Sequence, residues 1–383
     1  MKMKLGDVCT FIGGGTPSKK NPAFYGGTIP WATVRDMNVR VITKTEHSIT
    51  PDAVAQSATN IIPSGEIVIS THVGLGKVCF LGQDTAINQD LKAVIPVDGL
   101  ARRYLFYWFV SKAKNLISNG KGATVKGVTL NFVKSLEINV PSLKEQEEVS
   151  NALDGLSNLI ELSEEQLGRL GRIVKSRFVE MFGDPMTNPL EWPMAKIGDY
   201  MAFLTSGSRG WAKYYSGDGE LFITIKSVKG GKIDVNDVQY VKPPTGAEAE
   251  RTRVQEGDLL ISITADLGRT GVVSRELADR GAYINQHLSC VRLDRKSIEP
   301  LFLAFYLESA AGKAQFEKKN QSAVKAGLNF EAIQSLRFYL PPLALQREFA
   351  AFVAKVDKLA FAVRRRRDLA RKMYRAKIQE YFG

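Results

Sequence analysis

The chain has 383 residues, 44% of them hydrophobic and 24% charged, so it is long and apolar enough to form two or more packed globular domains. Lys and Arg (52) outnumber Asp and Glu (40), and the net charge of +12 favours a polyanionic partner. The longest strongly apolar stretches, 104–110 and 301–307, are too short to cross a bilayer, and no apolar signal segment follows the N-terminal lysines. We therefore expect a cytoplasmic protein that has no membrane partner.

The cysteines are few and scattered. Cys9, Cys79 and Cys290 stand in apolar contexts without metal-ligand spacing, and the chain has only three histidines. This composition predicts buried free thiols, with neither disulfides nor a metal site.

The chain repeats itself in order. Residues 65–77 (GEIVISTHVGLGK) align with 257–269 (GDLLISITADLGR), and 86–94 (AINQDLKAV) align with 283–291 (YINQHLSCV). The segment FVEMFG, which ends the first copy at Gly183, aligns with IQEYFG, which ends the second copy at Gly383. Two copies of a unit of roughly 200 residues are therefore predicted.

Each copy begins with a segment of mixed periodicity. Short β-like runs at 66–70, 92–96 and 136–140 are separated by Gly, Pro, Asn and Ser, and 101–117 reads as a helix. The predicted fold class is mixed α/β, with one globular domain at residues 1–140 and a second at 184–340.

A long helix is predicted after each domain, at 141–183 and 341–383. Ser142 and Glu145 form a capping-box pattern at the start of the first helix. The first helix carries a net charge of −3 and the second +7, which favours an antiparallel coiled coil of the two and explains Arg364–Arg367 as a basic flank rather than a DNA-binding arm. The expected seam residues are Val149, Leu153, Leu156, Ile160, Leu167, Leu170, Val174, Phe349, Val353, Val356, Val363 and Tyr374.

Three sequence patterns resemble catalytic motifs, but each of them departs from the motif that it resembles. FIGGG at 11–15 and NPAF at 21–24 are similar to two motifs of adenosylmethionine-dependent methyltransferases. In those enzymes the two motifs lie at the ends of different strands of one sheet, and the segment between them here is too short to form such strands. GLGK at 74–77 lacks the first glycine and the Ser or Thr of a phosphate-binding loop. Asp52, Asp90 and Lys92 match only a loose nuclease pattern, which the second copy lacks. We expect no catalytic residue, no metal and no cofactor in this chain.

Four phrases, in order, resemble the specificity subunit of Type I restriction-modification systems. They are GGGTPSKKNPAFYGGTIPWATVRDMN (13–38), INQDL (87–91), PSLKEQEEV (141–149) and SGSRGWAKYYSGDGELFITI (206–225). The resemblance covers essentially the whole chain. It implies a non-catalytic reader of double-stranded DNA with two target recognition domains on a helical spacer. Its implied partners are N6-adenine methyltransferase (M) subunits and endonuclease/translocase (R) subunits, to which adenosylmethionine, ATP and magnesium would belong.

This interpretation predicts an asymmetric, bipartite target and places its readers on loops with Lys or Arg for phosphates and polar side chains for bases. Ile87 and Ile284 suit core positions, Asn88 and Asn285 suit turns, and Trp31 and Trp211 suit packing beneath the loops. The candidate DNA-binding residues are Thr16, Ser18, Lys19, Arg35, His72, Lys77, Asp90, Lys121, Lys126, Ser208, Arg209, Lys226, Lys229, Arg269, His287, Lys318, Lys319 and Lys325.

Two other functions stay open at this point. One is a self-sufficient modification or restriction enzyme whose catalytic site has an unfamiliar pattern. The other is a coiled-coil scaffold whose globular domains bind protein, for which binding to duplex DNA would be insensitive to salt.

Overall fold

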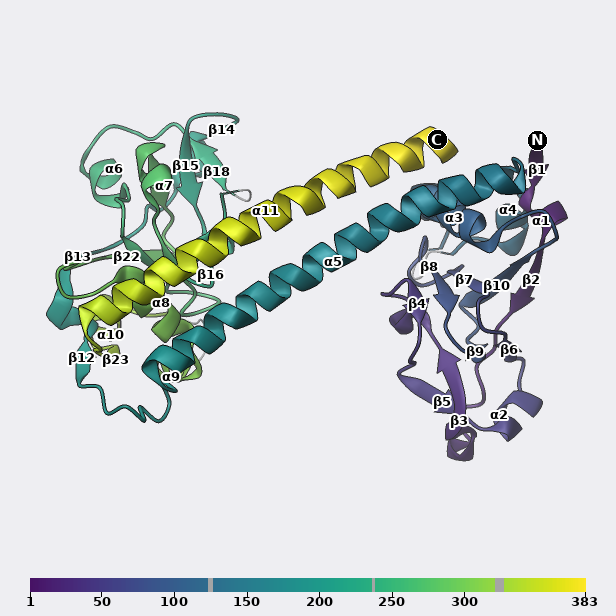
Figure 1. The fold of residues 1–383 in the computed structure, drawn as a ribbon, viewed down its shortest axis with the longest axis horizontal. Helices are drawn as coiled ribbons and strands as arrows, with labels where there is room; N and C mark the ends of the chain where they lie inside the picture. The colour runs from purple at the N-terminus through teal and green to yellow at the C-terminus, as the bar shows by residue number, and fades with distance from the viewer. Residues whose placement is uncertain (123–126, 236–237, 321–326) are drawn as a thin grey trace. The chain divides into compact units, whose positions relative to one another are not determined.

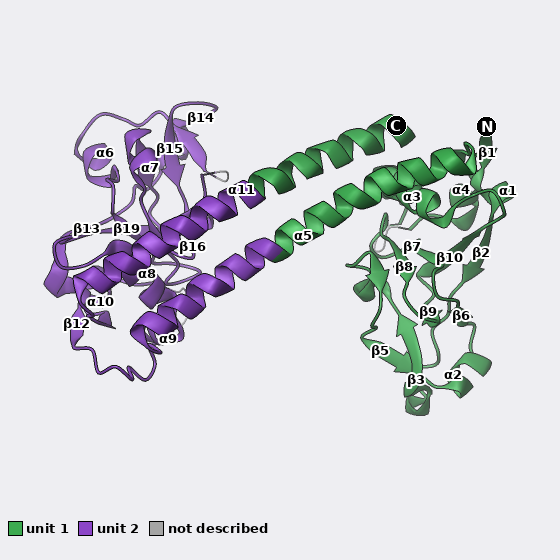
Figure 2. Cartoon of the chain, in the orientation of Figure 1, with its two compact units in different colours: residues 1–165, 364–383 green, residues 166–363 purple. Residues whose placement is uncertain are grey.

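The computed structural model describes residues 1–122, 127–235, 238–320 and 327–383. The chain divides into two compact units, which Figure 2 shows in green and purple. Unit 1 contains residues 1–165 and 364–383, and unit 2 contains residues 166–363. Each unit therefore holds one globular domain together with parts of both long helices (Figure 1).

The first domain is built on two main sheets, with strand orders β2-β10-β7-β8-β4 and β5-β3-β9-β6, and a small β1-β11 pair. Its strands are β1 (Lys2–Lys4), β2 (Cys9–Gly13), β3 (Tyr25–Ala32), β4 (Val41–Ile42), β5 (His47–Ile49), β6 (Asn60–Ile62), β7 (Ile67–Ser70), β8 (Val78–Leu81), β9 (Thr85–Ile87), β10 (Leu91–Pro96) and β11 (Glu137–Asn139). Its helices are α1 (Leu5–Val8), α2 (Pro51–Ala55), α3 (Arg102–Ser118) and α4 (Leu130–Ser135), with 3₁₀ turns η1 (Pro22–Phe24) and η2 (Val34–Asp36).

The second domain has sheets of order β13-β22-β19-β20 and β14-β18-β15-β21, with the pairs β12-β23 and β16-β17. Its strands are β12 (Met194–Lys196), β13 (Met201–Ser206), β14 (Tyr215–Ser216), β15 (Glu220–Ile223), β16 (Val228–Lys229), β17 (Lys232–Ile233), β18 (Gln239–Val241), β19 (Leu259–Ser262), β20 (Thr270–Val272), β21 (Ala282–Ile284), β22 (Leu288–Leu293) and β23 (Arg337–Tyr339). Its helices are α6 (Ala247–Thr252), α7 (Arg275–Asp279), α8 (Pro300–Glu308), α9 (Ala310–Lys319) and α10 (Phe330–Gln334), with 3₁₀ turns η3 (Ile197–Tyr200), η4 (Trp211–Tyr214) and η5 (Ile225–Ser227).

The internal repeat is confirmed by strand pairing. In the first domain β7 lies between β10 and β8, and in the second β19 lies between β22 and β20. Ile67 of β7 is opposite Val94, and its aligned residue Leu259 is opposite Val291. The two copies therefore share strand register as well as sequence, and the mixed α/β prediction holds for both.

The duplicated INQ segments form scaffold, as predicted. Ile87 and Ile284 end parallel-paired strands and are fully buried. In both copies the asparagine that follows closes a turn: Oδ1 of Asn88 accepts a hydrogen bond from the amide of Asp90 at 3.2 Å, and Oδ1 of Asn285 accepts one from His287 at 3.2 Å. The repeated motif thus fixes the turn that presents residue 90 or 287.

A glycine is required where another loop crosses each INQ turn. A Cβ atom at Gly14 would lie 2.1 Å from the carbonyl oxygen of Asn88, and one at Gly207 would lie 2.1 Å from that of Asn285. Any side chain would push the loop away from the turn. Gly14 and Gly15 of FIGGG therefore serve close backbone packing in this fold.

The long helices α5 (Leu143–Phe182) and α11 (Leu343–Phe382) begin and end close to the predicted bounds. The capping box is present: the Ser142 hydroxyl accepts from the amide of Glu145 at 3.3 Å, and the Glu145 carboxylate accepts from the amide of Ser142 at 2.9 Å. The Ser142 hydroxyl also donates to the Glu145 carboxylate at 2.7 Å, and this bond, with the one from the Ser142 amide, lowers the pKa of Glu145.

The predicted seam residues are all buried or partly buried, but many of them lie in the domain cores. Leu153 packs in unit 1 with residues of the first domain, and Val174 and Phe349 pack in unit 2 with Phe302. Within unit 1, an ion pair between Glu164 and Arg371 also joins the two helices. The seam therefore holds helix to domain as well as helix to helix, which the heptad pattern alone does not indicate.

The three cysteines are buried and free, as predicted. Burial raises the pKa of the Cys9 and Cys79 thiols to about 12. Among the described residues, none of the helices combines the length and the apolar character that a bilayer-spanning segment needs.

Candidate nucleic-acid interface

A cavity of about 690 Å³ opens on the first domain and gathers several of the predicted DNA-binding residues. Thr16, Lys19, Arg35 and Asp90 all line it, although they come from three separate segments of the chain. Its other lining residues are Pro22, Tyr25, Trp31, Thr33, Val34, His47, Val73, Asn88 and Gln89. The cavity therefore combines cationic, polar and aromatic groups in one concave surface, the composition expected of a surface that meets nucleic acid.

Aromatic residues of β3 anchor the loop that carries Thr16 and Lys19. Trp31 is buried, and its indole nitrogen donates to the carbonyl of Gly15 at 3.2 Å. The Tyr25 hydroxyl donates to the carbonyl of Pro17 at 2.7 Å. The exposed loop side chains are thus presented from a fixed backbone, and the predicted place of Trp31 beneath the loop is confirmed.

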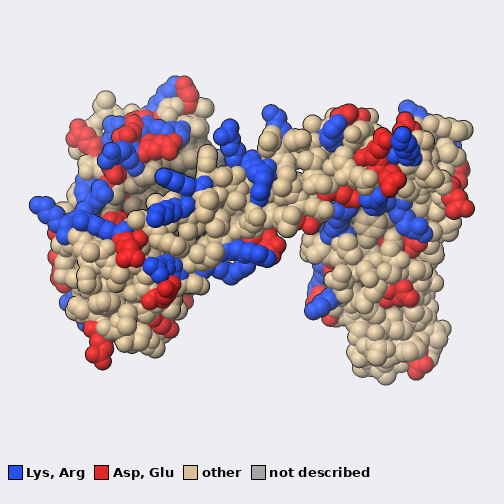
Figure 3. Space-filling model, viewed as in Figure 1, with Lys and Arg blue, Asp and Glu red and all other residues tan. Residues whose placement is uncertain are grey.

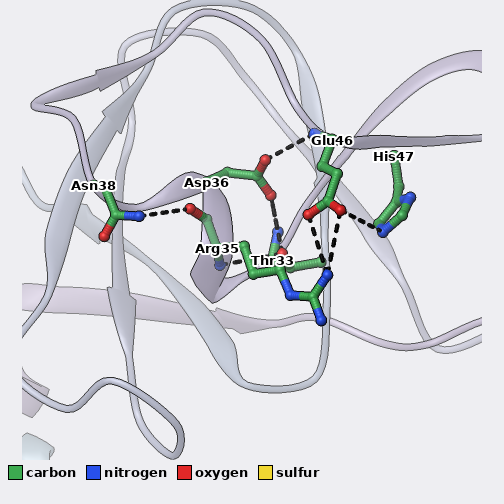
Figure 4. Close-up of polar contacts among 6 residues, drawn as sticks. All are labelled: Thr33, Arg35, Asp36, Asn38, Glu46 and His47. Atoms are coloured by element: carbon green, nitrogen blue, oxygen red, sulfur yellow. Dashed lines mark hydrogen bonds and ion pairs between the residues drawn. The ribbon is translucent and has the colours of Figure 1, made fainter. Parts of the chain in front are cut away.

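Arg35 lies on a short turn that Asp36 holds in place (Figure 4). The Asp36 carboxylate accepts hydrogen bonds from the amide of Thr33 at 2.7 Å and from the amide of Glu46 at 2.8 Å. Glu46 in turn pairs with Arg35 at 3.2 Å and lies 3.9 Å from His47. A cation, an anion and an imidazole therefore stand together at the rim of the cavity.

Two aligned positions, 72 and 90 in the first copy and 264 and 287 in the second, hold one histidine in each copy, but not at the same position. In the first domain Nδ1 of His72 lies 3.8 Å from Oδ1 of Asp90. In the second domain the residue aligned with His72 is Thr264, whose hydroxyl lies 2.6 Å from Nδ1 of His287, the residue aligned with Asp90. The histidine is the first residue of this pair in the first domain and the second residue of it in the second domain. Equivalent turns of the two domains therefore present different hydrogen-bonding groups.

The ammonium group of Lys77, a predicted DNA contact, is engaged in hydrogen bonds within the domain. Its ammonium donates to the carbonyl of Val34 at 3.3 Å and to Oδ1 of Asn38 at 2.7 Å, so it braces the turn that carries Arg35. Ser18, His72 and Lys121 are exposed, whereas Lys126 lies outside the described residues.

The second domain departs from expectation at Ser208. This residue is 2% exposed and its hydroxyl lies 3.0 Å from that of Thr252, so it is a core contact rather than a surface group. Arg269 forms an ion pair with Asp266 of the same loop, and Lys319 donates to the Ser335 hydroxyl at 2.6 Å. Arg209, Lys226, Lys229 and Lys318 are exposed, His287 is half-buried, and Lys325 lies outside the described residues.

A smaller cleft of about 340 Å³ in the second domain contains none of the predicted residues. It is lined by Phe203, Ala247, Glu250, Arg251, Arg253, Gln255 and Arg292. On the face shown in Figure 3, basic and acidic side chains are interspersed over unit 2. The net positive charge of the chain is therefore not concentrated in one uninterrupted basic surface on this face.

Sequence reasoning missed five residues of the first cavity or its rim: Tyr25, Thr33, Glu46, His47 and Gln89. One signal was available. Thr33 and Asp36 have the spacing of a capping box, which predicts a fixed turn around Arg35. No local pattern brings Glu46 and His47 to that turn.

The methyltransferase-like NPAF phrase has a structural explanation. Asn21 caps the turn η1, its side-chain oxygen accepting from the amide of Ala23 at 3.2 Å. Within the described part of the chain, no three His, Cys, Asp or Glu side chains are grouped as metal ligands.

Comparison with known proteins gives the family. The model of the Type I restriction modification DNA specificity domain matches residues 1–171 and 222–368. The chain is 29% identical over 259 residues to the Type I restriction enzyme MjaIX specificity subunit of Methanocaldococcus jannaschii, covering 61% of this chain and 59% of that protein. It is 32% identical over 172 residues to the EcoR124I/EcoR124II specificity subunit of Escherichia coli, covering 43% of each.

The fold has solved counterparts. The structure of a Type I restriction-modification S subunit from M. genitalium superposes with a TM-score of 0.60 at 14% identity, covering 100% of this chain and 96% of that one. At this identity the likeness concerns the fold alone. Since the family model matches both copies of the repeat and most of the chain, this protein belongs to the family of Type I restriction modification DNA specificity domains.

Proposed function

We propose that this chain is the DNA-reading subunit of a Type I restriction-modification complex and that it recognises an asymmetric, bipartite target. Residues 1–140 and 184–340 would each read one half-site, and the helices at 141–183 and 341–383 would set the distance between them. Two readers with shared architecture suit two half-sites about one helical turn of DNA apart.

The observation that carries this proposal is that both domains share one scaffold but present different polar side chains at the same turn. Both copies keep the buried isoleucine, the asparagine turn and the crossing glycine. At the position presented by that turn, one copy has Asp90 beside His72 and the other has His287 beside Thr264. A carboxylate accepts hydrogen bonds, whereas an imidazole can donate one, so the two turns favour different base edges.

In this proposal the first cavity provides the contacts of the first reader. Lys19 and Arg35 would neutralise phosphates, and Asp90, Gln89 and His72 would reach base edges. Arg209, Lys226 and Lys229 are the corresponding exposed cations of the second reader. The partners are M subunits, which would hold adenosylmethionine and methylate adenine, and R subunits, which would use ATP and magnesium.

The test is to co-express this chain with the adenine methyltransferase encoded beside it, in a host that lacks such methylation. Long-read sequencing then maps N6-methyladenine. The proposal predicts one bipartite, asymmetric motif, methylated on both strands and lost when this chain is omitted. Methylation that persists without the chain, or purified chain that methylates or cuts DNA alone, would contradict it.

A further inference from the structure

Each globular domain is attached to its own long helix by a buried glutamine. The Gln146 carboxamide donates to the carbonyls of Gly99 at 2.8 Å and Pro141 at 2.9 Å, and its oxygen accepts from the amide of Ala101 at 2.8 Å. In the second copy Gln346 donates to Pro341 at 2.8 Å and accepts from the amide of Glu299 at 2.9 Å. Ala101 and Glu299 are the N-cap residues that directly precede α3 and α8, so the attachment is duplicated.

Each long helix also packs into the core of its domain, through residues such as Leu153 in unit 1 and Phe349 in unit 2. Apolar packing has no preferred direction, so a second polar contact farther along the helix helps to fix the angle between the domain and the helix. In both units such a contact exists, and it is an ion pair between an aspartate of the long helix and a basic residue in or directly before a short strand of the domain.

In unit 1 this second contact joins Arg40, which directly precedes β4, to Asp154 of α5. The Arg40 guanidinium also lies over the rings of Phe106 and Tyr107, 5.5 Å from each centroid. Asp154 receives further hydrogen bonds from the Tyr107 hydroxyl at 2.5 Å and from Arg103 at 2.8 Å. The contact therefore has several polar partners and is largely shielded from solvent.

In unit 2 the corresponding contact joins Lys232, the first residue of β17, to Asp357 of α11. The turn before Lys232 is itself fixed, because the amide of Gly230 donates to the Glu308 carboxylate at 2.7 Å. The two contacts hold comparable places: β4 pairs with β8, and Gly231, which directly precedes β17, forms an isolated bridge to Gly271 of β20. Asp154 lies eight residues after Gln146 (154 − 146) and Asp357 eleven after Gln346 (357 − 346), so each pair lies roughly 12–17 Å along its helix from the glutamine.

From this duplicated arrangement we infer that Arg40–Asp154 and Lys232–Asp357 are positioning pairs that set the angle of each recognition domain on its helix, and through that angle the spacer length that the complex accepts. The inference rests on the proposed function. Changing the spacer by one base pair moves a half-site by about 3.4 Å along the DNA and roughly 35° around it. A domain that a directional ion pair holds at this second point resists that rotation, and loss of the pair lowers the resistance, because the remaining apolar contacts are non-directional.

The test uses the complete chain co-expressed with its methyltransferase, as above, once the wild-type motif is mapped. The host carries a plasmid library in which both half-sites are kept and the spacer is shortened or lengthened by one or two base pairs. Arg40→Gln and Lys232→Gln each remove one positioning pair. Asp154 keeps Tyr107 and Arg103 as partners in the first variant, so no buried charge is stranded.

We expect each variant to methylate the same half-sites but to raise the ratio of methylation at altered spacers to that at the native spacer by about tenfold. Arg40→Lys should restore most of the wild-type ratio. Matched controls are Lys377→Gln in unit 1, which pairs with Glu380 on the same helix, and Arg275→Gln in unit 2, which pairs with Glu256 inside the domain. These controls should leave the ratio unchanged.

The outcomes separate the inference from the proposed function. If wild-type chain directs no bipartite motif, the proposed function fails and the inference falls with it. If the motif is present and both positioning variants keep the spacer ratio of their controls, the inference alone is overturned.

Discussion

Arg35 and Glu46 form an exposed ion pair at the rim of the first cavity, with Nη1 of Arg35 at 3.2 Å and 3.4 Å from the two carboxylate oxygens of Glu46. An anion so close to a candidate phosphate contact competes with DNA for the same guanidinium. Exposed ion pairs of this kind contribute only about 0.2–1 kcal/mol of stability. A DNA phosphate can therefore displace Glu46 from Arg35 at a small cost in free energy.

Glu46→Gln should therefore raise the affinity of the complex for duplex DNA, by about two- to fivefold at low salt. Arg35→Ala should lower it and reduce the salt slope by about one. Titrations at several salt concentrations measure both effects. Lys44→Gln, two residues before Glu46, is a control for charge alone, and an equal effect of Lys44→Gln and Arg35→Ala would contradict a specific role for Arg35.

Lys77→Ala should weaken DNA binding indirectly, because Lys77 braces the turn of Arg35 through Val34 and Asn38. Combined with Lys126→Ala, it should still leave thermal stability and assembly with the methyltransferase nearly intact. Binding titrations, thermal melts and co-purification measure the three quantities. Loss of assembly in the double variant would mean that these lysines are structural.

Arg292→Ala should destabilise the second domain by about 3–5 kcal/mol, because it leaves the fully buried carboxylate of Asp258 without its ion-pair partner. The present pair is bidentate, with both N–O distances 2.7 Å. Denaturant unfolding measures the loss. Arg275→Ala, which breaks the more exposed pair with Glu256, should cost no more than about 0.5 kcal/mol. Similar losses in the two variants would contradict the prediction.

The pair at Asp154 predicts an acid-dependent loss of stability. Burial opposes ionisation of this carboxyl, but hydrogen bonds from Tyr107 and Arg40 outweigh it and hold its pKa below the usual 3.8. A lowered folded-state pKa contributes stability that is complete above the unfolded value and is lost as the pH falls through the folded one. Melting temperatures of wild type should therefore fall below about pH 4 more steeply than those of Asp154→Asn. Parallel curves for the two proteins would show that Asp154 does not contribute.

Much of the architecture was predictable because its signals are local. Ser142 and Glu145 are three residues apart, and Asn88 closes its turn on Asp90 two residues later, so each pattern contains its own partners. The internal repeat was readable because both copies preserve the alternation that buries Ile87 and Ile284. Within the candidate site, the three segments that supply Thr16 and Lys19, Arg35, and Asp90 were identified from their polar and cationic residues.

The sequence by itself thus determined the two copies, their long helices and the loops that carry candidate contacts. Only the tertiary structure decided which of those side chains are free: it buries Ser208 against Thr252, ties Lys77 to Asn38 and places Glu46 beside Arg35. It also decided that α5 and α11 pack into the domain cores, and that Arg40 meets Asp154, which lies 114 positions later in the chain. The physical reason is that periodicity and capping depend on near neighbours, whereas burial and ion pairing depend on residues that only the folded chain brings together.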